Sequence, residues 1–222
     1  MDHTRHLGVY NIPSLMAVSI VGAGGIGALA AMTLSKMGVN FLELLDNDKV
    51  DTVNLATQLH TVSGVGNYKV DDVAKIIHLF SDEARVLALR QIVDANTQFR
   101  TPEIVISAVD SWNARKAIWQ AVLHQDKMPH FYIDTRMSAE IFQMAVVNLS
   151  SYIAREHYDA AVMSLDENDI PEVVCTEKAT FYCADMASGH IGAAIKRIVT
   201  GDDRSYQVHH NIAKNVLYEF GI

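Results

Sequence analysis

The sequence feature that most constrains the fold is a glycine-rich turn between an apolar segment and a helix of small residues. Residues 18–21 form a short apolar run that is typical of a buried strand. The run leads into GAGGIG at residues 22–27, which fits the pattern G-x-G-x-x-G. Residues 28–37 then predict a helix that ends at a Gly38 cap. Strand, turn and helix together predict the start of a βαβ unit.

Two carboxylates follow the second apolar strand predicted, at residues 41–45: Asp46 and Asp48. Asp46 comes about 20 residues after the turn, where an acid that binds a ribose hydroxyl usually stands. Glycines in such a turn allow a tight bend, close approach of the backbone to a phosphate, and close packing of helix on strand. The glycines of this turn are Gly22, Gly24, Gly25 and Gly27. We therefore predict a nucleotide-binding unit, the alternative being glycines that serve only close packing.

Composition excludes several classes of protein. The net charge of −8 over 222 residues argues against a broad surface for nucleic acid or anionic membranes. Residues 12–35 carry no charge, but four glycines within six residues argue against a membrane helix. The two cysteines, Cys175 and Cys183, and the lack of a signal-like N-terminus lead us to expect a cytoplasmic protein with free thiols.

The rest of the chain alternates predicted strands with predicted helices. The strands are expected at residues 86–93, 104–109 and 131–133, and the helices at 69–80, 113–124 and 179–199. This alternation predicts a doubly wound, Rossmann-like α/β fold with a mostly parallel sheet. Residues 140–149 are expected to add an antiparallel strand near the C-terminus, residues 151–178 a polar crossover loop, and residues 202–222 stay unassigned. We predict one domain over residues 1–222.

Polar side chains with phosphate-binding or metal-binding chemistry follow the strands in this pattern. Asn54 and Gln58 are four residues apart and share a helical face if their loop forms a turn. Lys69 supplies a point charge for phosphates, and Asp110, after the strand at 104–109, is a candidate Mg²⁺ ligand. Ligands in such sheets bind beyond the carboxyl ends of the strands. The set suits a nucleoside triphosphate with Mg²⁺.

These motifs, in this order, resemble the ThiF/MoeB/HesA family of the ubiquitin-activating enzyme superfamily. The resemblance covers about residues 5–200. Its motifs are Gly22-Ala-Gly-Gly-Ile-Gly27, Asp46-Asn-Asp48, Asn54-Leu55-x-x-Gln58, Gly66-x-x-Lys69, Asp110 and Ile133-Asp134-x-Arg136.

The resemblance implies that Mg-ATP adenylates a carboxylate and that pyrophosphate is released. The acceptor would be the C-terminal glycine of a ubiquitin-like or sulfur-carrier protein, or a small carboxylic acid. By analogy Asp46 would hold the ribose, Asn54, Gln58 and Lys69 the phosphates, and Asp110 the metal. Arg5 matches an N-terminal arginine that reaches the ATP of the partner subunit in a homodimer.

The sequence departs from the family pattern at two points. Thr57 stands where the family usually has an arginine before the glutamine, so one triphosphate contact is missing unless Arg5 or Arg136 replaces it. No pair of C-x-x-C motifs occurs, and we expect no structural zinc. Cys175 is a candidate nucleophile for a later thioester, with a packing thiol as the alternative, and Cys183 is expected in the core.

Two alternatives to an adenylating enzyme stay open at this point. An NAD-dependent oxidoreductase would use the same glycine turn but would leave Lys69 and Asp110 without a role. An inactive nucleotide-binding scaffold would be consistent with Thr57.

Overall fold

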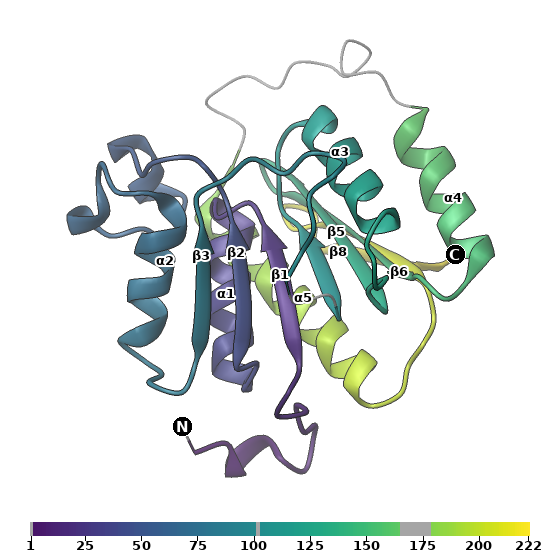
Figure 1. The fold of residues 1–222 in the computed structure, drawn as a ribbon, viewed down its shortest axis with the longest axis horizontal. Helices are drawn as coiled ribbons and strands as arrows, with labels where there is room; N and C mark the ends of the chain where they lie inside the picture. The colour runs from purple at the N-terminus through teal and green to yellow at the C-terminus, as the bar shows by residue number, and fades with distance from the viewer. Residues whose placement is uncertain (1, 101–102, 165–178) are drawn as a thin grey trace.

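A single eight-stranded sheet organises the computed structural model, which describes residues 2–100, 103–164 and 179–222 (Figure 1). The strand order is β3-β2-β1-β4-β5-β6-β7-β8, and β1 to β5 are parallel. Strands β6 to β8 extend the sheet in antiparallel fashion. The strands are β1 Ala17–Val21, β2 Phe41–Leu45, β3 Arg85–Leu89, β4 Ile104–Ser107, β5 Phe131–Ser138, β6 Ile141–Asn148, β7 Tyr206–Asn211 and β8 Val216–Gly221. The predicted α/β fold with a mostly parallel sheet is confirmed.

Helices cover both faces of the sheet. One face carries α1 Gly25–Met37, α2 Lys69–His78 and α5 Phe181–Val199, whose apolar residues share one core with the sheet. The other face carries α3 Trp112–Leu123 and α4 Tyr152–Met163, which form a second core (Figure 1). Short 3-10 turns lie at Thr4–His6, Thr52–Ala56 and Val62–Gly64. No helix in the described ranges has both the length and the apolar character needed to cross a membrane.

The central strands supply residues to both cores in alternation. In β4, Ile104 and Ile106 belong to the core beneath α1, whereas Val105 belongs to the core beneath α3. Successive side chains of a strand point to opposite faces, so a strand covered on both sides must be apolar throughout. The unbroken apolar runs in the sequence reflect this double coverage.

Two segments of the chain differ from the sequence-based prediction. The expected crossover loop at residues 151–178 begins with helix α4, which Ser151 caps by accepting a hydrogen bond from the Ala154 N–H. Its buried residues Ala154, Tyr158 and Val162 repeat every four residues and pack against the sheet. Residues 165–178 lie outside the described part. The unassigned tail forms the β7–β8 hairpin.

The glycine turn is held tightly between β1 and α1. Gly22 has φ +94°, and a Cβ atom there would lie 2.6 Å from the carbonyl oxygen of Ala108. A Cβ atom at Gly27 would collide with the carbonyl oxygen of Gly22. Both positions therefore exclude any side chain, as the motif predicts, and only the turn at residues 22–24 separates β1 from α1.

We expect Gly27→Ala to destabilise the protein by about 3 kcal/mol or more, because the added methyl group meets backbone that is unable to move without displacing α1. Gly189→Ala is the matched control, since Gly189 lies within exposed α5 surface with open space around it. That change should stabilise the protein by about 0.5–1 kcal/mol through helix propensity. Urea unfolding measures both, and equal midpoints for Gly27→Ala and wild type would contradict the packing argument.

Candidate functional site

The carboxyl ends of the parallel strands form the upper edge of the sheet in Figure 1. Residues that follow these strand ends line a cleft of about 910 Å³. The side of the cleft nearest β1 and β2 is formed by the glycine turn and the residues after β2. The predicted site residues that line the cleft as a whole are Gly22, Gly24, Gly25, Asp46, Asp48, Asn54, Gln58, Lys69 and Asp110. The fold thus brings together residues that are up to 88 positions apart in the sequence (Gly22 to Asp110).

Asp46 joins the end of β2 to the glycine turn. One carboxylate oxygen accepts the N–H of Ala23 at 2.7 Å, and the other accepts the N–H of Asp48 at 2.8 Å. Each oxygen keeps a second lone pair, so the side chain remains able to accept a hydrogen bond from a ligand hydroxyl. The first N–H groups of α1 have no acceptor within the helix and open toward the same cleft.

Asn54 and Gln58 are brought together by a short turn, as the spacing predicted. The N–H of Gln58 donates to the carbonyl of Asn54 at 2.9 Å, and the Asn54 side chain accepts from the Asp51 N–H at 2.9 Å. The Gln58 amide stands 3.9 Å from the place where a Cβ of Gly24 would lie. Its buried side-chain oxygen has no hydrogen-bond partner in the described residues, which suits a site that a polar ligand completes.

Lys69 forms an ion pair with Asp48. Its Nζ lies 2.9 Å from a carboxylate oxygen of Asp48, and its backbone N–H donates to the Asp48 carbonyl at 2.9 Å. The lysine side chain is 11% exposed, whereas that of Asp48 is 61% exposed. The stem of Lys69 is therefore fixed by packing while its ammonium group reaches the cleft.

Asp110 is exposed at the end of the loop after β4 and borders the cleft. The N-cap of α3 is Ser111, whose side chain accepts the Ala114 N–H, so capping does not account for Asp110. An exposed carboxylate beside this cleft suits Mg²⁺, which takes one or two carboxylates and fills its other positions with water and phosphate oxygens. The described residues contain no cluster of three or more side chains for an all-protein metal site.

Arg136 enters the cleft from β5 and is held from two sides. It forms an ion pair with buried Asp134 at 3.0 Å and lies over the Trp112 ring at 4.2 Å from the ring centre. Buried Arg115, from α3, pairs with the same carboxylate and also donates to the Val109 carbonyl at 2.6 Å. Asp134 thus ties α3 to β5 and gives the cleft a fixed guanidinium group.

Burial shapes the ionisation of the groups behind Arg136. Removal from water lowers the pKa of Arg115 and raises the pKa values of Tyr132 and Tyr158, which form edge-on ring contacts with each other. The tyrosines stay neutral at physiological pH. The charge of Arg115 is therefore balanced by the Asp134 carboxylate, with which it forms the ion pair.

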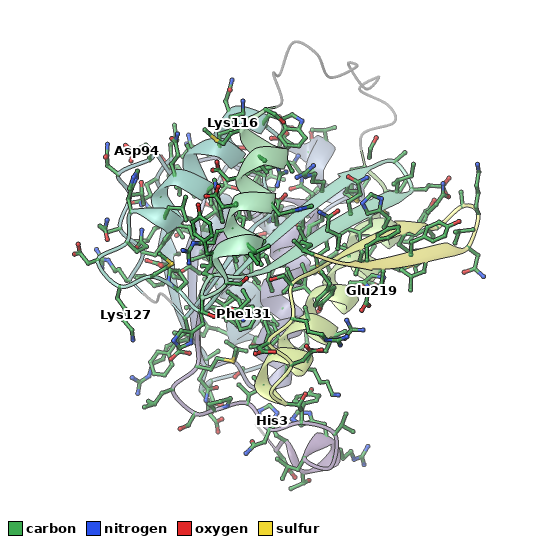
Figure 2. All side chains as sticks on the ribbon, turned by 90° about the vertical axis from the view of Figure 1, so that its right-hand side faces the viewer. His3, Asp94, Lys116, Lys127, Phe131 and Glu219 are labelled. Carbon is green, nitrogen blue, oxygen red and sulfur yellow. The ribbon has the colours of Figure 1, made fainter. Side chains whose placement is uncertain are left out.

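Arg5 lies far from the cleft of its own chain. It belongs to the first 3-10 turn, whose neighbour His3 packs on Gly38 at the C-terminal end of α1. The cleft lies at the other end of this 13-residue helix, about 20 Å away. Figure 2 shows His3 at the lower end of the molecule and Lys116, from the start of α3, at the upper end. The fold therefore does not bring Arg5 to the other predicted site residues.

The remaining predicted positions have different outcomes. Thr57 lines the cleft. The position at which the family pattern has an arginine therefore lies within the site. Cys175 lies outside the described residues. Cys183 is fully buried on α5, as expected for a core residue, and burial raises the pKa of its thiol to about 11.

Three residues beside the cleft were not anticipated from the sequence: Arg115, Trp112 and His60. Arg115 meets Asp134 only because β4 and β5 pair, which no local pattern reveals. Trp112 comes two residues after Asp110, just beyond a predicted strand end. Because ligands bind beyond the carboxyl ends of the strands, this position could have indicated that Trp112 lies beside the cleft. His60 is buried beneath the glycine turn, where Nε2 lies 3.0 Å from the Ala23 carbonyl oxygen.

Comparison with known proteins agrees with this geometry. The model of the ThiF family matches residues 7–218. The chain belongs to the ThiF family. This ThiF family chain is 35% identical over 141 residues to a probable molybdopterin-synthase adenylyltransferase of Gracilaria tenuistipitata var. liui. It is 30% identical over 117 residues to ubiquitin-like modifier-activating enzyme 5 of Aedes aegypti.

The matches cover 59% and 46% of this ThiF family chain and 39% and 30% of the two relatives. The chain therefore spans well under half the length of either relative. A crystal structure of E. coli MccB with ATP superimposes with a TM-score of 0.70 at 16% identity, over 94% of this chain and 64% of that one. At this identity the superposition establishes the shared fold.

We expect Cys183 to resist alkylation in the folded protein. In a Cys175→Ser variant it is the sole thiol. With a pKa of about 11, only about one thiol in a thousand is ionised at pH 8, against about a quarter for a free cysteine. Iodoacetamide should react at least about 100-fold more slowly than in urea, and the rate should rise about tenfold per pH unit while the protein stays folded. Equal rates in folded and unfolded protein would contradict the burial of the thiol.

Proposed function

We propose that this chain adenylates a carboxylate with Mg-ATP and releases pyrophosphate. The observation that carries the proposal is a single cleft that brings together a glycine turn, a buried lysine, the Gln58 amide and an exposed carboxylate. Support comes from the relative named an adenylyltransferase and from the MccB structure with ATP. An NAD-dependent oxidoreductase would use the glycine turn but would give no role to Lys69 or Asp110.

Each residue has a role that follows from its position. We assign the ribose hydroxyls to Asp46, because its oxygens are held at the end of β2 and keep free lone pairs. Asn54, Gln58 and Lys69 bind the phosphates, assisted by the N–H groups at the start of α1. Asp110 holds Mg²⁺ through its exposed carboxylate. The oxygen of the acceptor carboxylate attacks the α-phosphorus, and pyrophosphate leaves.

The protein accelerates this step by positioning and charge neutralisation. Lys69 moves from Asp48 to the phosphate oxygens and neutralises part of the charge that gathers on the leaving group. The turn and α1 keep their N–H groups fixed, so little reorganisation is needed during the reaction. Mg²⁺ held by Asp110 would supply positive charge that lowers the cost of the negative charge on the phosphates.

Arg136 is our candidate for the triphosphate contact that Thr57 lacks. Its guanidinium lines the same cleft, and the ion pair with Asp134 and the stacking on Trp112 hold it in place. A guanidinium suits phosphate recognition because it donates two parallel hydrogen bonds. This assignment favours an active enzyme over an inactive scaffold.

The acceptor belongs to one of two classes. A C-terminal glycine of a ubiquitin-like or sulfur-carrier protein is suggested by the relative named for activating ubiquitin-like modifiers. A small carboxylic acid is the other. Cys175 would act only after adenylation, because the carboxylate itself is the nucleophile in the first step. We place the reaction in the cytoplasm and treat residues 1–222 as one adenylation domain.

We further propose a homodimer with shared sites. The position of Arg5 supports it, because Arg5 lies about 20 Å from the cleft of its own chain, at the far end of α1. A twofold neighbour would bring Arg5 to the cleft of its partner without rearrangement of either chain. Twofold dimers are also the commonest assembly.

We expect Mg-ATP to bind and Asp110→Ala to lose activity more than binding. Without the carboxylate the metal is poorly held as charge develops, a loss of several kcal/mol at the transition state. Calorimetry gives the affinity for ATP and NAD, and pyrophosphate exchange with a Gly-Gly-terminated carrier that supports exchange in wild type gives the activity. Asp126→Asn is the control, an exposed carboxylate away from the cleft. Tighter binding of NAD than of ATP would overturn the function, and full exchange in Asp110→Ala would overturn the metal assignment.

Arg5→Ala and Asp110→Ala should each be nearly inactive, yet complement each other after subunit exchange. Random mixing makes half the dimers hybrids, and in each hybrid the site with intact Asp110 receives the intact Arg5 of its partner. Activity should return to about a quarter of wild type. Native mass spectrometry of a mass-tagged chain verifies the exchange. Verified hybrids without activity would show that Arg5 does not act across the dimer.

A further inference from the structure

His60 lies beneath the glycine turn with an acceptor at each ring nitrogen. Its side chain is fully buried, 0% exposed. Nε2 lies 3.0 Å from the carbonyl oxygen of Ala23, and Nδ1 lies 3.1 Å from a carboxylate oxygen of Asp72. These two contacts satisfy the buried ring nitrogens and fix the ring between the glycine turn and α2.

The partners of His60 determine which atoms donate. A carbonyl oxygen only accepts hydrogen bonds, so Nε2 carries a proton. Asp72 also accepts from the N–H and the hydroxyl of Thr61, both at 3.0 Å, so its carboxyl group is fixed beside the ring. The contact between Nδ1 and Asp72 holds the ring in the orientation in which Nε2 faces the Ala23 carbonyl.

The Ala23–Gly24 peptide is consequently held from two directions. The Ala23 N–H donates to Asp46, and the Ala23 carbonyl accepts from His60. The described chain contains no cis peptide, and in a trans peptide the carbonyl and the following N–H point in opposite directions. The Gly24 N–H therefore points away from His60, and Gly24 lines the cleft.

We propose that His60 is a positioning residue that presents the Gly24 N–H to the phosphates of the bound nucleotide. The inference rests on the proposed function, since it assumes that a nucleotide fills the cleft. The Nε2 donor on the Ala23 carbonyl also polarises the peptide and makes the Gly24 N–H a stronger donor. Asp72 lies one turn after Lys69 on α2, so the same chain of hydrogen bonds connects the glycine turn to the helix that carries the lysine.

Two substitutions separate the two ring contacts. In His60→Gln the side-chain amide reaches the position of Nε2 and keeps a donor for Ala23. In His60→Asn the amide reaches only the position of Nδ1, which keeps the Asp72 contact and loses the Ala23 contact. Both variants lose the same buried ring, so their stabilities should fall by similar amounts in urea unfolding.

The nucleotide affinities should differ between them. We expect His60→Asn to bind Mg-ATP at least tenfold more weakly than wild type, and His60→Gln to stay within about threefold. Adenosine, which has no phosphates, should bind all three proteins equally. Equal affinity of His60→Asn and wild type for Mg-ATP would overturn the role of His60. Failure of wild type to bind Mg-ATP would instead overturn the proposed function on which it rests.

Nuclear magnetic resonance of the wild-type protein tests the same proposal without any substitution. With ¹⁵N-labelled histidine, His60 should show a ring N–H signal at Nε2, assigned through the proximity of its proton to Ala23. Burial should slow the exchange of this proton with water enough for detection. A ring without a proton at Nε2 would overturn the proposal even if both variants failed to fold.

Discussion

The close contact between Gly27 and the carbonyl of Gly22 is the constraint on which the rest of the structure depends. It lets α1 begin at the end of β1, so that the N-terminus of the helix faces the cleft. It also sets α1 flat on the sheet, where α5 can pack across it. At Gly192 of α5 a Cβ atom would lie 3.0 Å from the sulfur of Met37, so this second helix contact is close as well. One backbone approach thus determines both the core beneath α1 and the position of the N–H groups at the start of α1, beside the cleft.

The opposite side of the cleft depends on a different interaction, the two arginines that share Asp134. A buried carboxylate with two guanidinium partners joins α3 to β5 and fixes Arg136 over Trp112. Loss of one partner from such a group is costly because it leaves a charge uncompensated in the interior. The glycine turn is held by steric fit, whereas this side is held by charge. The two sides of the cleft are therefore fixed by different residues and by different kinds of interaction.

Sequence reasoning succeeded where the signal is local. The turn at Gly22, the acid at Asp46 and the pair Asn54 and Gln58 all depend on spacing within one segment, and the structure brings them to one cleft. It failed at α4, although Ala154, Tyr158 and Val162 carry a helical repeat, because the polar residues between them masked the pattern. It also missed His60 and Arg115, whose partners lie 37 and 19 positions away and meet them only through the fold. Contacts of that kind follow from strand pairing and packing, and no single segment encodes them.

The ion pair between Lys69 and Asp48 has a consequence for selectivity. Asp48 is a tethered competitor, present at the lysine at a high effective concentration in every unliganded molecule. The binding free energy that a ligand gains from Lys69 is therefore only a difference. It is the ligand's attraction to the ammonium group minus the attraction of the Asp48 carboxylate to the same group. A polyphosphate carries several negative charges and displaces Asp48 from Lys69. A singly charged or neutral ligand leaves Lys69 paired with Asp48. With the proposed function, the pair sets a charge threshold, and we expect adenosine and its monophosphate to be poor inhibitors compared with the triphosphate.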